Sequence, residues 1–237
     1  MTNKELVSKL QNVVDDYKTV YMWGVVGSPV TESIIAQKVK QYPFWYTSDR
    51  VTFFKSFVNK GYFAFDCVCL IKAILWGWNG DTNKTYGGAV YTSNGVPDID
   101  ANTMIYRSLN VSTDFSKIEI GEALWCEGHI GVYIGNGKAI ECTSSWSNNV
   151  QVTAVKNIGT ISGLNLRQWT KHGKLPYITY EAATSTPPDK SSVWATESWQ
   201  WAFENGLFDG TNPTLLLSRE QTAEAFFRLY KKGALKL

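Results

Sequence analysis

The segment that most restricts how this chain can fold is HIGVYIGNGKAIEC, residues 129–142. Apolar residues alternate with other residues on both sides of a Gly-Asn-Gly turn at 135–137. Such alternation is typical of two antiparallel strands that each turn one face toward a core. We therefore predict a β-hairpin, whose register decides which side chains share a face.

The length of the turn decides where Glu141 points. A two-residue loop at 136–137 would put Glu141 on the face opposite His129. A three-residue loop at 135–137, with a left-handed glycine, pairs Glu141 with Gly131 and puts it diagonally beside His129. We predict the three-residue loop. It gives a core face of Ile130, Val132, Ile134, Ile140 and Cys142, and a cleft face of His129, Gly131, Tyr133, Ala139 and Glu141. Tyr133 is accordingly a candidate substrate-binding residue.

An apolar helix is predicted within FAFDCVCLIKAILWGW, residues 63–78. The residues that recur at helical spacing are Leu70, Ile71, Ile74, Leu75 and Trp78. This pattern places Cys67 in or just before the first turn. Unpaired backbone N–H groups and the helix dipole favour a thiolate there, and the same groups can donate to an oxyanion. Cysteine is also among the most buried residue types, so simple packing is the alternative role for Cys67.

The neighbours of Cys67 have structural roles in this prediction. Asp66 is expected to accept backbone hydrogen bonds at the start of the helix. Cys69 lies about 200° around the helix axis from Cys67, so it should point into the protein. A metal site built from Cys67, Cys69, Cys126 and His129 is disfavoured by their spacing, and we expect no metal and no other cofactor.

A cysteine nucleophile usually needs an imidazole base, and the chain contains two histidines. His129 opens the first strand of the hairpin, and Glu141 follows 12 residues later. A base and its orienting carboxylate could therefore share one hairpin. Taken alone, His129 would be an ordinary hydrogen-bonded strand residue. His172 lies in the polar segment WTKHGK and is expected on the surface.

Two parts of the chain are predicted. Residues 1–180 form an α+β domain in which the Cys67 helix packs on an antiparallel sheet. The polar, proline-containing EAATSTPPDKSS at 181–192 is typical of a linker. Residues 193–237 then form a small helical hairpin, its first helix ended by Gly206 and its second capped by Ser218.

Composition sets the expected location and partners. The N-terminal MTNKELVSKLQNVVDD lacks the features of a signal peptide, and no apolar run of about 18 residues suggests a membrane partner. We expect the protein to accumulate in the cytoplasm. The four cysteines should stay reduced there. A formal charge of +2 predicts no nucleic-acid partner.

Three separated pieces resemble the NlpC-type cell-wall cysteine peptidases, papain-like hydrolases that cut the stem peptides of peptidoglycan. FDC at 65–67 resembles the family's nucleophile motif, although Val-Cys replaces the usual small residues after it. GHIGVYIGNGKAIE at 128–141 resembles the base segment, with the third catalytic group at the same spacing. YMWG at 21–24 resembles an upstream Tyr-x-aromatic-Gly-Gly segment, but Val25 replaces the second glycine and the gap to Cys67 is longer than usual.

The resemblance implies a papain-like fold and a Cys-His-Glu mechanism. Cys67 would attack an amide carbonyl, His129 would transfer the proton, and Glu141 would orient His129. Tyr21 would help the backbone N–H of Cys67 to hold the oxyanion. The implied activity is a D-γ-glutamyl-diamino acid endopeptidase. An N-acetylmuramoyl-L-alanine amidase with the same nucleophile, and a non-catalytic wall-binding protein, are the alternatives.

The C-terminal segments WAFENGLFDGT and SREQ resemble parts of one S-layer homology repeat, a type of cell-wall anchor. The resemblance implies that Arg219 lies near a secondary wall polymer. The family usually supplies three repeats in a ring, so a single repeat implies either self-association or an incomplete site. WTKHGKLPYITY at 169–180 resembles the end of such catalytic domains in endolysins of phages that infect clostridia. We therefore expect a phage endolysin with a wall-binding module, and a merely stabilising appendage is the alternative for residues 193–237.

Overall fold

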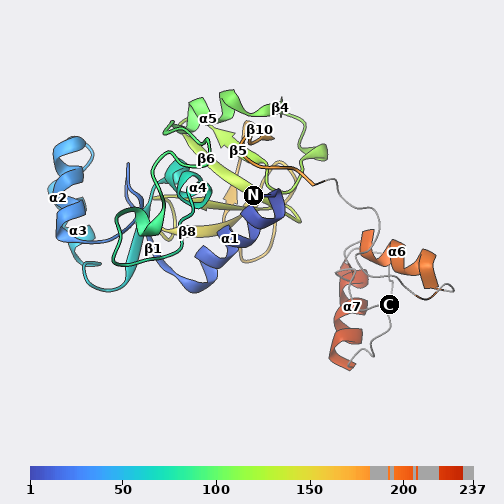
Figure 1. Ribbon diagram of the computed structural model, residues 1–237. Helices are drawn as coiled ribbons and strands as arrows, with labels where there is room; N and C mark the ends of the chain where they lie inside the picture. Colours follow the sequence, from blue (N-terminus) through green and yellow to red (C-terminus); the bar gives the residue numbers. More distant parts are fainter. Residues whose placement is uncertain (182–191, 193–194, 205–206, 208–218, 232–237) are drawn as a thin grey trace. The chain divides into compact units, whose positions relative to one another are not determined.

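An antiparallel sheet and one buried helix organise the first part of the chain in the computed structural model, which describes residues 1–181, 192, 195–204, 207 and 219–231 (Figure 1). The chain divides into two compact units, Met1–Tyr180 and Glu181–Leu237. The helices of the first unit are α1 (Asn3–Asp16), α2 (Glu32–Gln41), α3 (Ser48–Lys55), α4 (Cys67–Leu75) and α5 (Ala101–Arg107), with 3-10 turns η1 (Thr85–Gly88) and η2 (Phe115–Lys117). Its strands are β1 (Lys18–Tyr21), β2 (Val26–Pro29), β3 (Tyr62–Phe65), β4 (Leu109–Ser112), β5 (Ala123–Cys126), β6 (His129–Gly135), β7 (Lys138–Cys142), β8 (Val150–Val155), β9 (Leu166–Arg167) and β10 (Lys171–Lys174).

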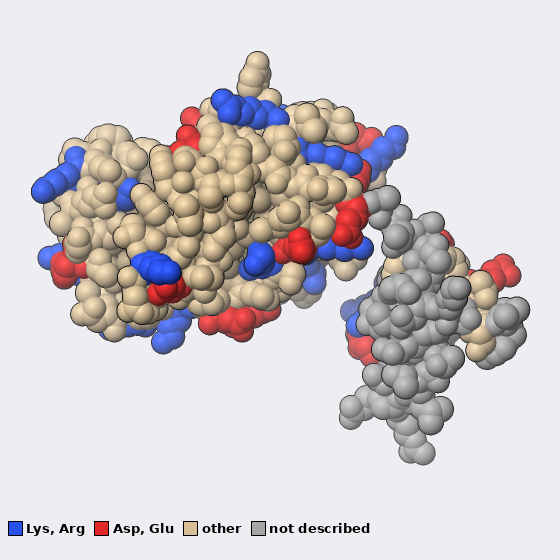
Figure 2. All heavy atoms as spheres, viewed as in Figure 1, with Lys and Arg blue, Asp and Glu red and all other residues tan. Residues whose placement is uncertain are grey.

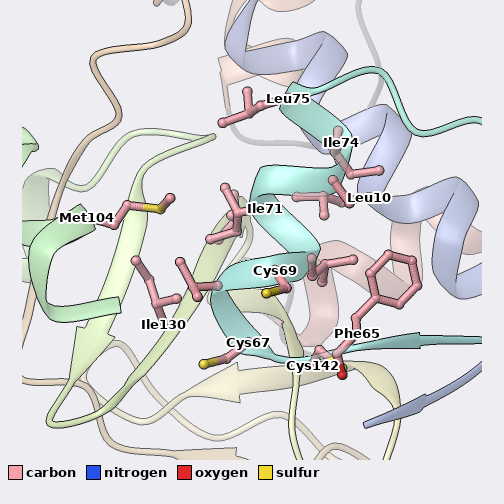
Figure 3. Packing of buried hydrophobic residues seen from close by; sticks show 14 of the residues in the cluster. Leu10, Phe65, Cys67, Cys69, Ile71, Ile74, Leu75, Met104, Ile130 and Cys142 are labelled. Carbon is pink, nitrogen blue, oxygen red and sulfur yellow. The ribbon is translucent and has the colours of Figure 1, made fainter. Parts of the chain in front are cut away.

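The larger sheet has seven strands in the order β4-β10-β5-β6-β7-β8-β9. Neighbouring strands are antiparallel except for the last pair, β8 and β9, which are parallel. Helix α4 packs against β6 and β7, with α1 beside it, and these elements share the largest hydrophobic core (Figures 1 and 3). The predicted α+β class, with a helix on an antiparallel sheet, is therefore confirmed.

A second, three-stranded sheet has the order β1-β3-β2 and was not predicted from the sequence. Strand β3 lies at its centre, parallel to β1 and antiparallel to β2, and runs into α4 after one residue. Helices α2 and α3 cover this sheet through a separate core that includes Met22, Ile35, Tyr46 and Phe54. The small sheet therefore leads directly into the N-terminus of α4 through β3.

The N-terminal helix begins as its Thr-x-x-Glu pattern predicts. Glu5 N–H donates to Thr2 Oγ1 at 3.2 Å, and Thr2 N–H donates to Glu5 Oε2 at 2.7 Å. This reciprocal pair satisfies two backbone donors that the first turn leaves free. The apolar face of α1 is buried through Leu6, Leu10 and Val13.

The register of the β6–β7 hairpin is the predicted one, but its turn is not. Tyr133 pairs with Ala139, which places Glu141 opposite Gly131. The loop itself has two residues, Asn136 and Gly137, both with positive φ, as in a type I′ turn. An irregularity in the pairing between Tyr133 and Gly135 adds one residue to β6. This bulge restores the register that a three-residue loop would have given.

The two faces of the hairpin are both covered. The predicted core face contributes Ile130, Val132, Ile140 and Cys142 to the main core, with Ile134 packed at its edge. On the other face, Tyr133 is 8% exposed and packs in a separate buried cluster with Phe115, Leu124 and Trp169. Its hydroxyl accepts a hydrogen bond from Gly137 N–H at 3.2 Å. The prediction that Tyr133 binds substrate is therefore wrong, because side chains from η2, β5 and the segment after β9 fill the space in front of it.

His172 is also buried, contrary to the sequence prediction. Its exposed fraction is 3%, and its Nδ1 contacts the carboxylate of Glu122, itself 3% exposed. Its Nε2 lies 3.0 Å from the backbone oxygen of Asp114, to which it donates. The polar residues around His172 in the sequence did not reveal that β10 lies between β4 and β5 inside the sheet.

The second unit contains two described helices, α6 (Thr196–Glu204) and α7 (Arg219–Lys231), which match the predicted helical pair. The predicted helix-ending Gly206, the capping Ser218 and most of the predicted linker lie outside the described residues. Arg219 begins α7, but its side chain is also outside them, so its predicted role in polymer binding stays a prediction.

In the view of Figure 2, the surface of the first unit has no large patch of one charge. Lys and Arg residues there are interspersed with Asp and Glu around a broad area without charged residues. Across the described part of the chain, no helix combines the length and the apolar character needed to cross a bilayer.

Candidate active site

Cys67 is the first residue of α4, as the sequence predicts. Asp66 caps the helix by accepting hydrogen bonds from Cys69 N–H at 2.7 Å and from Gly24 N–H at 2.8 Å. The carboxylate therefore ties the loop after β1 to the start of α4 and fixes where the thiol lies. Figure 3 shows Cys67 at this end of the helix, with Ile130 of β6 nearby.

The ionisation of Cys67 is set by burial. The side chain is 7% exposed, and desolvation, with a further contribution from the Asp66 carboxylate, raises the pKa of the thiol to about 12. Backbone N–H groups of Ile130, Val68 and Cys67 itself act in the opposite sense but do not offset the burial. Burial thus opposes the thiolate that the helix end was predicted to favour. Contact with the N–H of Ile130 nevertheless places the sulfur beside the residue that follows His129.

His129 and Glu141 form the predicted pair. The imidazole Nε2 lies 2.6 Å from Glu141 Oε2, and the side chain of His129 is 14% exposed whereas that of Glu141 is fully buried. The remaining ring nitrogen, Nδ1, is thus the one that can exchange a proton with a reacting group. A base and its orienting carboxylate share one hairpin, as the register requires.

Glu141 has two further partners that the sequence did not predict. Arg167 Nε lies 2.6 Å from the same Oε2, as an ion pair without the alignment of a hydrogen bond. Thr153 Oγ1 donates to Oε1 at 2.7 Å. Burial alone would raise the pKa of Glu141, but the hydrogen bond and charge of His129 and the charge of Arg167 outweigh it and lower that pKa. Glu141 is therefore ionised at neutral pH.

Trp169 covers the histidine. Its indole stacks on the His129 imidazole with centroids 5.6 Å apart and 13° between the planes. A Cβ at Gly131 would lie 3.0 Å from the Trp169 ring, so the absence of a side chain at 131 lets the indole approach the sheet this closely. Sequence reasoning missed Arg167 and Trp169, and two residues of β9 offer no periodic pattern that could have indicated them.

Tyr21 lies in the same region. Burial first, then the nearby Cys67 and Asp66, raise the pKa of its phenol, so the hydroxyl is neutral and can donate. Its backbone N–H donates to Asn148 O at 2.9 Å, which ties β1 to the loop after β7. Tyr21 thus interacts with Cys67, and Cys67 contacts the backbone N–H of Ile130, the residue that follows His129.

No protein-family model matches this chain, and no curated protein matches it either. Among solved structures, NlpC2 from Trichomonas vaginalis is similar, with a TM-score of 0.37 and 10% sequence identity. The similarity covers 73% of this chain and 46% of that protein's chain, so this chain spans less than half of its length. The chemistry of the site therefore rests on its own geometry.

A cavity of about 410 Å³ opens on the side of α4 that carries Cys69. Its lining includes Trp23, Tyr42, Asp66, Cys69 and Lys72. The buried Lys72 pairs with Asp98 at its edge. Cys69 is itself only 4% exposed, so it is buried as predicted.

The described residues hold no group of three or more His, Cys, Asp or Glu side chains arranged to bind a metal ion. All four cysteines are free thiols. What the site offers chemically is a thiol at a helix N-terminus, an imidazole held by an ionised carboxylate, and backbone and phenol donors beside the thiol. These groups suit nucleophilic acyl transfer.

Proposed function

We propose that this protein is a cysteine peptidase that hydrolyses amide bonds in the stem peptides of bacterial peptidoglycan. The observation that carries the proposal is the 2.6 Å contact of His129 with Glu141 on the hairpin that packs against the N-terminus of α4, where Cys67 begins the helix. The sequence pieces that resemble NlpC-type peptidases fall on these same residues. They motivate the choice of peptidoglycan as substrate and of the D-γ-glutamyl-diamino acid bond as the one cut.

The proposed reaction starts from a protonated Cys67 thiol, with His129 as the base. As Cys67 Sγ bonds to the amide carbonyl carbon, its proton passes to His129 Nδ1. The oxyanion is held by the N–H of Cys67 and the hydroxyl of Tyr21. His129 then gives the proton to the departing amine, which leaves a thioester on Cys67. Water, deprotonated by His129, attacks the thioester and releases the acid, and the proton returns to the thiol.

Glu141 supports both proton transfers. An ionised carboxylate on Nε2 holds the ring in place and stabilises the imidazolium that each addition step creates.

The wider role we propose is that of a phage endolysin, stored in the cytoplasm of the producing host and active on the wall at lysis. The second unit would be a wall-binding module, with Arg219 near a secondary wall polymer and with self-association completing the binding site. The likeness of its sequence to an S-layer homology repeat motivates this.

Digestion of purified peptidoglycan, followed by mass spectrometry of the fragments, tests the proposal. We expect new D-glutamate and diamino-acid ends. A free lactyl group on muramic acid would instead identify an amidase that uses the same nucleophile. Unchanged fragments would indicate a non-catalytic wall-binding protein and overturn the proposal. Cys67→Ser is the matched inactive variant, because a serine hydroxyl of similar size hardly ionises beside His129. Cys69→Ala is the matched active one.

A further inference from the structure

One carboxylate oxygen, Glu141 Oε2, contacts two basic groups in this site. Both His129 Nε2 and Arg167 Nε lie 2.6 Å from Glu141 Oε2. Glu141 has no exposed surface, so water does not share in neutralising it. Its charge is therefore divided between an imidazole, which can lose its proton, and a guanidinium, which cannot.

Arg167 is held in place independently of Glu141. A terminal nitrogen donates to Thr143 Oγ1 at 3.1 Å. The guanidinium lies over the Trp146 ring at 4.8 Å and near the Trp169 ring at 5.7 Å. The side chain is 18% exposed. Because three neighbours fix it, Arg167 cannot swing into water without losing these contacts as well as the ion pair.

The other titratable groups around the cluster are three thiols and the Glu127 carboxylate. Cys67 of α4, Cys126 of β5 and Cys142 of β7 are thiols whose pKa values burial raises. Glu127, after β5, accepts a hydrogen bond from Asn102 at 3.1 Å. Among the described residues, Arg167 is thus the permanently charged cation in contact with Glu141.

We propose that Arg167 is a positioning residue that acts through Glu141: it anchors the carboxylate and keeps the proton affinity of His129 lower than Glu141 alone would make it. An opposite charge within about 4–6 Å favours a charged imidazole by about 1–3 pKa units, and a like charge disfavours it by a similar amount. Arg167 therefore cancels part of the effect of Glu141. The consequence for catalysis rests on the proposed function, in which His129 must be uncharged to accept the proton of Cys67.

The test is a titration of His129 by NMR of labelled imidazole in the full chain, which needs no substrate. The chain has two histidines, so two sets of ring signals are expected, and His129→Asn assigns them. Arg167→Met removes the charge but leaves an unbranched side chain between Trp146 and Trp169. Arg167→Lys is the matched control that keeps the charge.

We expect Arg167→Met to raise the pKa of His129 by about one unit, which is about a tenfold gain in proton affinity. Arg167→Lys should leave that pKa within a few tenths of the wild-type value. An unchanged pKa in the folded Arg167→Met protein, or an equal shift in both variants, would overturn the proposal.

A second measurement covers the case in which Arg167→Met does not fold. Arg167→Gln also removes the charge but keeps a polar side chain, and it should raise the pKa of His129 by about one unit. No rise in the folded Arg167→Gln protein, or a rise of the same size in Arg167→Lys, overturns the proposal. Peptidoglycan digestion is a separate measurement that tests the proposed activity. If the pKa of His129 shifts as expected but the protein digests no peptidoglycan, the proposed peptidase activity is wrong and the effect of Arg167 on His129 still holds.

Where digestion occurs, the acid limb of the pH dependence of kcat/KM should move with the pKa of His129. Arg167→Met should shift that limb upward by the same unit. A purely structural role for Arg167 would lower activity at every pH without moving the limb.

Discussion

Trp169 and His129 lie face to face, with ring centroids 5.6 Å apart and planes inclined by 13°. Trp169 is 2% exposed, and its Nε1 has no hydrogen-bond partner in the described part of the chain. The indole therefore contributes its flat apolar surface, and its N–H contributes no bond. This relationship predicts how the residue tolerates substitution.

Trp169→Leu should destabilise the protein by about 3 kcal/mol and lower hydrolysis, because it leaves a cavity over the imidazole and frees the ring to rotate. Trp169→Phe keeps a stacked ring and should cost about 1–2 kcal/mol while retaining most activity. Urea unfolding curves and peptidoglycan digestion measure the two effects. Equal activity of the leucine and phenylalanine variants would show that the stacking has no role in orienting His129.

The raised pKa of Cys67 predicts slow alkylation at neutral pH. Below a pKa of about 12 the thiol is protonated, so its reaction with iodoacetamide should accelerate steadily from pH 7 to pH 10. Cys126 is the most exposed of the four cysteines and should be labelled first. Peptide mapping by mass spectrometry after short exposures measures the order. Labelling of Cys67 faster than a free cysteine at pH 7 would mean that a thiolate is already formed.

Glu141 should contribute to stability in a pH-dependent way. Its pKa is lowered by folding, so its contribution is complete above the unfolded value of about 4.3 and is lost as pH falls through the folded value. We expect Glu141→Gln to lower the unfolding free energy by about 3 kcal/mol at pH 7, since Arg167 is then left without its carboxylate. The difference from wild type should shrink below about pH 4.

Urea unfolding at pH 7, 5, 4 and 3 measures this dependence. Asp15→Asn, on the exposed face of α1, is a control that should follow the wild type. A difference between Glu141→Gln and wild type that stays constant with pH would contradict an ionised, paired Glu141.

The buried His172 and Glu122 should matter for stability alone. His172→Gln leaves the Glu122 carboxylate without its partner and should cost about 3–5 kcal/mol. Below its melting temperature the variant should still digest peptidoglycan. The double variant with Glu122→Gln should recover part of the loss, because no charge is then left buried. Loss of digestion by a folded His172→Gln protein would require a role for His172 in the reaction.

Removal of the second unit should separate binding from chemistry. The first unit, Met1–Tyr180, has its own core, so deletion of residues 186–237 should leave it folded and active on soluble wall fragments. We expect weaker attachment to whole cells and slower lysis. Light scattering should report a monomer for the truncated chain and a larger particle for the intact one. A truncated chain that fails to fold, or that lyses cells as fast as the full chain, would contradict this division of roles.

Several features of the site could be predicted from the sequence because their causes are local. The apolar spacing after Cys67 and the acceptor side chain of Asp66 determine where α4 begins. The period of two in β6 and β7 favours the register that places Glu141 on the same face as His129, since a shift of one residue would exchange the two faces. The bulge before the turn did not alter this result, because the pattern of the faces constrains the register more strongly than the loop does.

The remainder was decided by contacts between distant segments. Alternation shows that Tyr133 and Ala139 share a face, but which segments cover that face depends on where η2, β5 and the residues after β9 pack. For the same reason, the polar neighbours of His172 did not show that it is buried beside Glu122. Arg167 reaches Glu141 from 26 residues away, through a strand too short to have a pattern. The pKa of Cys67 follows from how much water the surrounding core excludes, and that depends on the packing of the whole unit.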